Sequence, residues 1–123
     1  MILVDTSIWV DHLRAEGGPL GQLLQANMVC THNGVIGELA CGTLRNRTEI
    51  LALLRGLPRL AAASEDEVLF FIERHRLMGR GIGYVDVHLL AAAALHGAYL
   101  RTRDKRLKEI AEELDLAYLP AEH

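Results

Sequence analysis

Short apolar runs alternate with longer segments of helical periodicity along the chain, and this alternation restricts the fold more than any other feature. Ile2 opens a β-branched run that ends at Asp5, after which Ile8, Trp9 and Leu13 recur at helical spacing. Residues 28–30, 60–62, 98–102 and 117–119 are predicted as further strands. Because strands linked by helices form right-handed βαβ crossovers, we expect an α/β fold, a three-layer α/β/α sandwich with a mostly parallel central sheet.

The remaining segments predict helices with recognisable ends. Residues 20–24, 34–44, 46–56, 64–78, 84–96 and 104–114 show helical spacing of apolar residues, and the first of these follows a break at Gly17-Gly18-Pro19. Asn46 and Ser64 are each followed three residues later by Glu, the pattern of a capping box. Residues 84–96 are rich in alanine and nearly uncharged, which predicts a helix buried on most sides.

Length and composition favour one domain spanning residues 1–123, since 123 residues of which 50% are hydrophobic can form one core. The longest apolar run, residues 89–95, is too short to span a membrane. No positively charged segment precedes the apolar residues before Asp5, so no secretory signal is expected and the chain is predicted to be cytoplasmic. Cys30 and Cys41 lack metal-binding spacing and are predicted to be small buried residues.

The net charge of −3 argues against a protein that coats nucleic acid, but the basic residues are concentrated in two stretches. These are candidates for contact with phosphate groups. The alternative is that they form solvated helix faces. The first stretch contains Arg45, Arg47, Arg55 and Arg59, and the second contains Arg101, Arg103, Lys105, Arg106 and Lys108.

Four acidic residues occupy positions from which they can converge. Asp5 and Asp104 follow predicted strands, Asp86 lies in the first turn of a helix, and Glu38 lies at the edge of a helical apolar stripe. Functional sites of open parallel sheets lie at the carboxyl ends of the strands, so we expect one acidic pocket there. Converging carboxylates repel one another unless divalent cations neutralise them.

Oxygen ligands without His or Cys favour Mg²⁺ or Mn²⁺ over zinc. Such a site can activate a water for in-line attack on a phosphodiester, with one metal ion or two. The hydroxyls of Thr6, Ser7 and Thr102 are candidates for supporting the metal ligands. His88 is expected to be packed or hydrogen-bonded rather than catalytic.

Each acid also has a purely structural explanation. Asp5 and Asp104 could cap helices, and Asp86 could interact favourably with its helix dipole, whereas Glu38 would need an arginine partner. Two other functional classes stay open: a phosphoryl-transfer domain that uses a phosphorylated Asp5, and a regulatory module whose acids bind an arginine or amine of a partner. The phosphoryl-transfer class is weakened because no Asp lies two residues after Asp5 and no Lys is suitably placed.

Four segments resemble VapC-type toxins of the PIN-domain superfamily. They are residues 2–14, 37–40, 81–90 and 101–107, they occur in the family's order, and each contains one of the four acids. The resemblance implies a three-layer α/β fold and a ribonuclease that depends on Mg²⁺ or Mn²⁺. It assigns metal binding and catalysis to Asp5, Glu38, Asp86 and Asp104, with Thr6, Ser7 and Thr102 as supporting polar residues.

The resemblance also implies a set of partners. RNA would be the substrate, hydrolysed by a metal-activated water, and a VapB-like antitoxin would cover the acidic site with its tail. The toxin of such a type II toxin-antitoxin pair is expected to form a homodimer. Arg101, Arg103 and Lys105, which lie next to Asp104, are the candidates for substrate contact.

Overall fold

The computed structural model describes residues 1–14 and 19–120, and its centre is a parallel three-stranded sheet. The strands are β1 (Ile2–Val4), β2 (Val29–Cys30) and β3 (Tyr99–Arg101), in the order β2-β1-β3. Leu3 of β1 is paired with Cys30 on one side and Leu100 on the other. Since every residue of β1 is buried, both faces of the central strand are covered, as in other parallel sheets.

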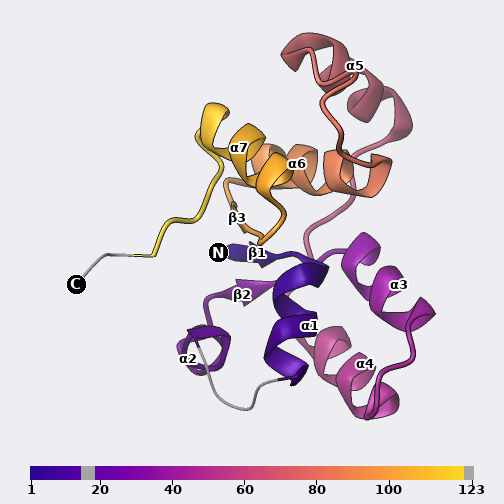
Figure 1. Cartoon of the computed structure of the whole chain (residues 1–123), viewed down its shortest axis with the longest axis vertical. Helices are drawn as coiled ribbons and strands as arrows, with labels where there is room; N and C mark the ends of the chain where they lie inside the picture. The colour runs from indigo at the N-terminus through magenta and orange to yellow at the C-terminus, as the bar shows by residue number, and fades with distance from the viewer. Residues whose placement is uncertain (15–18, 121–123) are drawn as a thin grey trace.

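Helices cover the sheet on both sides, with α6 and α7 on one side and α1, α2 and α4 on the other (Figure 1). The predicted three layers and parallel sheet are therefore confirmed. Gly17 and Gly18 of the predicted break lie outside the described residues, and α2 begins at Pro19. The helices are α1 (Thr6–Arg14), α2 (Pro19–Gln25), α3 (Asn33–Cys41), α4 (Arg47–Gly56), α5 (Glu65–His75), α6 (Tyr84–His96) and α7 (Lys105–Glu113).

The two strands predicted at residues 60–62 and 117–119 are wrong, because each of these parts of the chain forms only a single bridge with the sheet, at Arg59 directly before the first segment and at Ala117 in the second. Thr31 forms an isolated parallel bridge with Arg59, and Leu100 forms one with Ala117. Pro58 lies next to the first bridge and has no N–H to donate, which prevents a longer ladder. The sheet is thus extended at both edges by short bridging segments rather than by strands.

Several helix ends differ from the sequence predictions. The predicted helix 64–78 ends at His75, because Arg76 adopts a left-handed conformation with φ of 52°. The capping box of Ser64 is confirmed, whereas Asn46 makes no side-chain cap hydrogen bond. Cys41, the last residue of α3, is exposed, so the prediction that both cysteines are buried is wrong for this one.

The alanine-rich helix α6 forms much of the core, as predicted. Its buried residues are Val87, Leu89, Leu90, Ala91, Ala92 and Ala93. It ends at Gly97, which has a φ of 66° and donates its backbone N–H to the carbonyl of Ala93. None of the described helices combines the length and apolar character required to cross a bilayer.

The two predicted caps allow a matched test of stability. Ser64 Oγ accepts a hydrogen bond of 3.1 Å from the backbone N–H of Glu67, so Ser64→Ala should lower the Tm by about 3 to 5 °C. Asn46→Ala should change the Tm by less than about 1 °C, because no cap hydrogen bond is lost. Thermal unfolding followed by circular dichroism measures both values, and equal shifts would contradict this assignment of the caps.

Candidate active site

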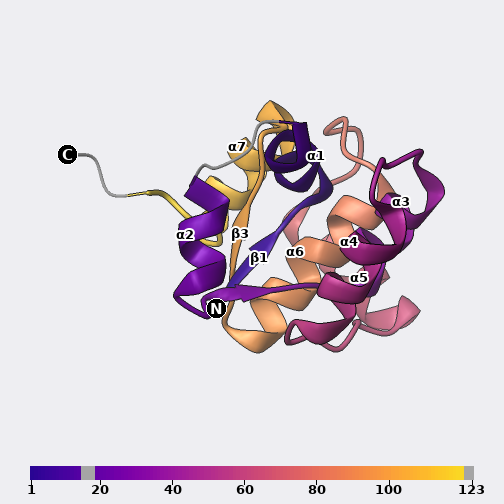
Figure 2. The ribbon, with the colours of Figure 1, turned by 90° about the horizontal axis from the view of Figure 1, so that it is seen from below.

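The four predicted acids lie around the carboxyl ends of the strands. Asp5 directly follows β1, and Asp104 follows β3 after a short segment. Figure 2 shows β1 leading into α1 and β2 leading toward α3, the helix that carries Glu38. Asp86 lies in the first turn of α6. The acids therefore come from four different elements that meet at one end of the sheet.

Asp86 interacts electrostatically with the other three carboxyl groups. Burial raises the pKa of Asp86 above its ordinary value, and the negative charges of Asp5, Glu38 and Asp104 raise it further. The backbone N–H of Gly83 donates a 3.2 Å hydrogen bond to Asp86 Oδ2, which lowers this pKa but does not reverse the shift. Asp86 is thus near enough to each of the other three carboxylates to interact with it, and none of the four forms an ion pair with a residue that the structure describes.

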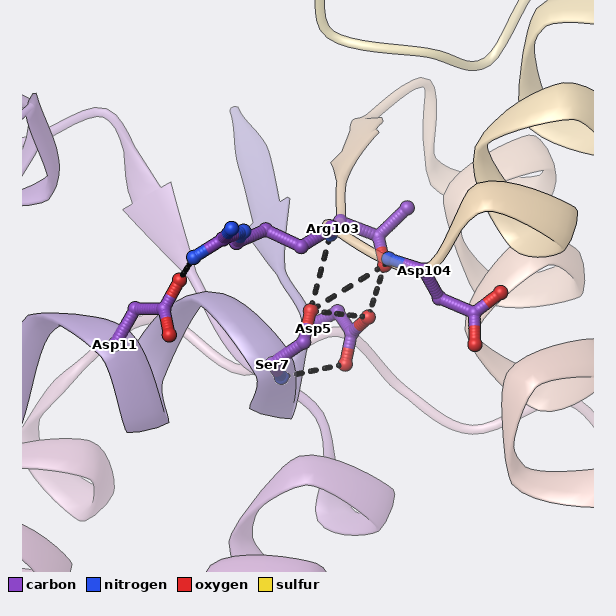
Figure 3. A network of polar contacts seen from close by, with 6 residues as sticks. Asp5, Ser7, Asp11, Arg103 and Asp104 are labelled. Carbon is purple, nitrogen blue, oxygen red and sulfur yellow. Dashed lines mark hydrogen bonds and ion pairs between the residues drawn. The ribbon is translucent and has the colours of Figure 1, made fainter.

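Asp5 is the most firmly held of the four, with 5% of its surface exposed. Its Oδ1 accepts a 3.1 Å hydrogen bond from the backbone N–H of Ser7, and its Oδ2 accepts from Ser7 Oγ at 3.1 Å and from the Thr102 hydroxyl (Figure 3). Ser7 Oγ in turn accepts a 3.0 Å bond from the backbone N–H of Arg103. This network ties the segment after β1 to the segment after β3 and fixes the direction of the Asp5 carboxylate.

Glu38 is exposed to solvent and is held by a hydroxyl group. Its Oε1 accepts a 2.8 Å hydrogen bond from Thr6 Oγ1, and Thr6 is the residue next to Asp5. In the described parts of the chain no arginine or lysine forms an ion pair with Glu38. Among the described residues, Glu38 therefore lacks the arginine partner that a purely structural role would require.

Asp104 caps helix α7, which is the structural role considered for it from the sequence. Its Oδ1 accepts a 3.0 Å hydrogen bond from the backbone N–H of Leu107 at the start of α7. Figure 3 shows its side chain pointing away from the network around Asp5. Asp104 therefore contributes negative charge to the site, while one of its oxygens is already engaged.

The donor set suits a hard cation that keeps part of its water shell. Among residues 1–14 and 19–120, no three His, Cys, Asp or Glu side chains are close enough together to hold an ion directly. A zinc site of the preformed, four-ligand kind therefore does not fit. Mg²⁺ is commonly bound through one or two carboxylates and several waters, and the all-oxygen set with its uncompensated charge fits that mode of binding.

Comparison with known proteins identifies the family. The sequence profile described as "PIN domain" matches residues 2–113. The chain belongs to the PIN-domain family. This PIN domain is 48% identical over 118 residues to a protein called "Ribonuclease VapC32" in two strains of Mycobacterium tuberculosis, CDC 1551 / Oshkosh and ATCC 25618 / H37Rv, with 95% of both chains covered. The resemblance to VapC-type proteins expected from the four motifs is confirmed.

Solved structures support the fold of this PIN domain. The crystal structure of PAE2754 from Pyrobaculum aerophilum superposes with a TM-score of 0.63 at 18% identity, covering 92% of this chain and 85% of that one. FitAB bound to an IR36 DNA fragment gives a TM-score of 0.61 at 18% identity over all of both chains. FitAcB from Neisseria gonorrhoeae gives 0.56 at 18% identity, with 95% of both chains covered. These similarities confirm the PIN-like α/β sandwich.

The predicted substrate-contacting residues of this PIN domain lie beside the acidic site. The guanidinium of Arg103 forms an ion pair with Asp11 of α1 (Figure 3), and Arg101 lies 5.6 Å above the ring centre of Tyr118. Lys105 is exposed at the first position of α7. Asp11 was not found by sequence reasoning, because its role depends on a contact between distant segments.

The arginines of the first basic stretch lie by α3 and α4. Arg47 Nε donates a 3.0 Å hydrogen bond to the carbonyl of Ala40, and Arg59 donates one of 3.1 Å to Asn33 Oδ1. Both of these arginines brace the helix that carries Glu38. They have structural partners even though they are exposed.

A buried histidine was also missed by sequence reasoning. His32 Nδ1 accepts a 2.8 Å hydrogen bond from the backbone N–H of Gly34 and so caps α3. Burial and the neighbouring His88 lower the pKa of His32. His88 packs edge-on against Tyr84, with ring centres 4.7 Å apart, as expected of a packed residue. The available signal for His32 was its position, a polar residue between a strand and a helix.

Proposed function

We propose that this PIN domain is a metal-dependent endoribonuclease and the toxin of a VapBC-type toxin-antitoxin pair. The observation that carries the proposal is that Asp5, Glu38 and Asp104 lie near enough to Asp86 to add to the rise in its pKa that burial causes. Support for the activity comes from the 48% identity to a protein named as a ribonuclease. Residues 1–123 form one nuclease domain in this assignment, and we expect it to act in the cytoplasm.

Ribonucleases of the PIN-domain family use a divalent metal ion, and we propose Mg²⁺ or Mn²⁺ here. Asp5, Glu38, Asp86 and Asp104 are the residues that would hold it. When bound, the ion lowers the pKa of a water and stabilises the charge that develops on the phosphodiester oxygens.

The remaining residues orient these carboxylates. Ser7 and Thr102 fix Asp5, so its carboxylate needs no reorganisation before the reaction. Thr6 directs Glu38, and the backbone N–H of Gly83 directs Asp86. These hydrogen bonds would act as outer-sphere contacts that orient the metal ligands.

The structure disfavours phosphoryl transfer through Asp5. Both carboxylate oxygens accept hydrogen bonds from Ser7 or Thr102, and only 5% of the residue is exposed. A nucleophile that must receive a phosphoryl group needs an oxygen open to in-line approach, whereas a cation needs only a lone pair such as the one that Oδ1 keeps. The regulatory-module alternative predicts that Mn²⁺ gives no heat of binding in titration calorimetry, whereas the nuclease proposal predicts measurable heat.

RNA is the proposed substrate, and Arg101, Arg103 and Lys105 are its proposed phosphate contacts. All three lie in the β3–α7 segment that also supplies Thr102 and Asp104. A phosphodiester bound at the acidic site would therefore have positive charge on one side of it. This charge offsets the repulsion between the RNA backbone and the four carboxylates.

Substitution of Arg103 tests this substrate contact. Arg103→Ala should weaken RNA binding about tenfold, because a charge-assisted phosphate contact is lost. Arg14→Ala removes the same charge from the exposed last residue of α1, which belongs to neither basic stretch, and should change the affinity by less than about twofold. Fluorescence anisotropy with labelled RNA in EDTA measures binding without cleavage, and equal losses in the two variants would reject the assignment.

A VapB-like antitoxin and a second copy of the chain are the proposed protein partners. The similarity to VapC-type proteins supports the antitoxin, and the homodimer is an expectation from the same resemblance. The primary test of the proposed function is cleavage of RNA by the purified chain with Mg²⁺ or Mn²⁺ and its arrest by EDTA. An antitoxin that binds the acidic site should inhibit this cleavage at equimolar concentration.

A further inference from the structure

An exposed aromatic ring lies at the start of α6, next to the acidic site. Tyr84 is the first residue of this helix and has 51% of its surface exposed, although much of α6 is buried. Asp86 follows two residues later in the same turn. A single exposed ring needs no explanation by itself, so its orientation and its position must decide what it does.

The ring of Tyr84 is held by a histidine one turn further along α6. It packs edge-on with His88, and the two ring centres are 4.7 Å apart. His88 is itself partly buried, and its ring lies 6.2 Å from that of the buried His32, the residue that caps α3. The Tyr84 side chain is therefore oriented before any ligand arrives, and less rotamer entropy is lost when a ligand binds.

Tyr84 lies where the helix of Asp86 meets the helix of Glu38. The next residue, Val85, lies against Gly34 of α3, so closely that a Cβ at position 34 would come within 2.9 Å of Val85 Cγ1. The start of α6 and the start of α3 are thus in contact beside these two acids. A phosphodiester bound at the acids would have its neighbouring bases on the side of Tyr84.

We propose that Tyr84 is a stacking platform for one unpaired base of the RNA, next to the phosphodiester that is cleaved. This inference rests on the proposed function and adds that the substrate must offer an unpaired base at that point. Aromatic side chains bind single-stranded RNA in this way, because every base has a flat face that can lie on the ring. A base inside a double helix is already stacked on its neighbours and could not use the platform.

Stacking supplies a contact that the charge of this chain does not supply. The net charge is −3 and the site contains four carboxylates, so the acidic residues repel the phosphate backbone unless cations neutralise them. A base held on an aromatic ring adds affinity that does not depend on the net charge of the protein. Tyr84 would therefore help to keep the RNA at a site whose own charge is unfavourable for it.

A second tyrosine provides a matched control. Tyr99 also has 51% of its surface exposed, but it begins β3 and so lies at the amino end of that strand. The acids lie at the carboxyl ends of the strands, at the opposite end of the sheet. Replacement of Tyr99 removes the same ring, with the same exposure, from a place where the proposal puts no base.

Fluorescence anisotropy with labelled single-stranded RNA in EDTA tests the platform without cleavage. Tyr84→Ala should raise the dissociation constant about tenfold, whereas Tyr84→Phe should stay within about twofold of wild type because it keeps the ring. Tyr99→Ala should also stay within about twofold. The dependence of affinity on salt should have the same slope for Tyr84→Ala as for wild type, because no charge is lost. Circular dichroism must show that the variants are folded.

RNAs that each lack one base identify the nucleotide that is stacked. At one position next to the cleaved bond, loss of the base should weaken binding to wild type about tenfold and binding to Tyr84→Ala less than about twofold. The platform is overturned if no such position exists, if Tyr84→Phe binds as weakly as Tyr84→Ala, or if Tyr99→Ala has the same effect as Tyr84→Ala.

The same experiments separate the platform from the proposed nuclease. RNA cleavage with Mg²⁺ but without this dependence on one base overturns the platform alone. A wild type that shows the dependence but does not cleave RNA with Mg²⁺ overturns the nuclease, and Tyr84 then remains part of an RNA-binding site. A wild type that binds no RNA overturns both.

Discussion

Asp5→Asn should lower the rate of RNA cleavage by at least about 1,000-fold while leaving the protein folded. Asn has nearly the same shape as Asp and can still accept the hydrogen bond from the backbone N–H of Ser7. The hydroxyls of Ser7 and Thr102 can turn to accept from the new amide group, so the network around residue 5 can be retained. What is lost is the negative charge, and without it the site holds a divalent cation more weakly.

Single-turnover cleavage of a labelled RNA at saturating Mg²⁺ measures this effect, and thermal unfolding verifies the fold. Glu112→Gln, at an exposed residue of α7, removes the same charge and should cleave within about twofold of wild type. If Asp5→Asn retains more than about a tenth of the activity, either a contaminating nuclease is responsible or the chemistry does not require this carboxylate. Calorimetry with Mn²⁺ separates these two explanations. If a contaminating nuclease is responsible, the variant should not bind metal. If the chemistry does not require this carboxylate, the variant should still bind metal.

The central part of the fold was predictable because its signals are local. Ile2–Val4 is a short apolar segment, Tyr99–Arg101 is centred on the buried Leu100, and Tyr84–His96 is apolar on nearly every side. The edges of the sheet were not predictable in the same way. Whether residues 60–62 pair as a strand depends on which segment lies beside them, and local composition does not contain that information. Pro58 is visible in the sequence, but its missing N–H matters only because this segment lies beside β2.

Topology predicted that Asp5 and Asp104 lie at one end of the sheet, since residues that follow parallel strands meet there. The detailed partners of the site residues were not predictable. Thr6 rather than an arginine contacts Glu38, and Asp11 holds Arg103, although nothing in the spacing of these residues indicates either contact. Side-chain pairs between distant segments depend on how helices pack, and that packing is fixed only in the folded chain.

Asp86→Asn should stabilise the metal-free protein and abolish its stabilisation by metal. Burial and the three neighbouring carboxylates raise the pKa of Asp86 above that of an unfolded chain. The charged form of Asp86 therefore lowers the free energy of unfolding. This destabilisation is at its maximum when the pH is above the raised pKa, and it disappears when the pH is below the ordinary Asp pKa of about 3.9. A neutral Asn can still accept the hydrogen bond from Gly83, so in EDTA at pH 7 its Tm should exceed that of wild type by about 2 to 4 °C.

Metal should reverse this order of stability. A cation that binds only the folded protein contributes about 2.7 kcal/mol at a concentration 100 times its Kd, so Mg²⁺ should raise the Tm of wild type by several degrees. Asp86→Asn should show little of this increase and should lose at least about 100-fold in cleavage rate, since weaker metal binding removes the activated water. Differential scanning calorimetry with EDTA and with Mg²⁺ gives the four Tm values, with Glu112→Gln as the control of equal charge change. A lower Tm for Asp86→Asn than for wild type in EDTA would mean that the carboxylates do not repel one another, and the cation would then have no excess negative charge to neutralise.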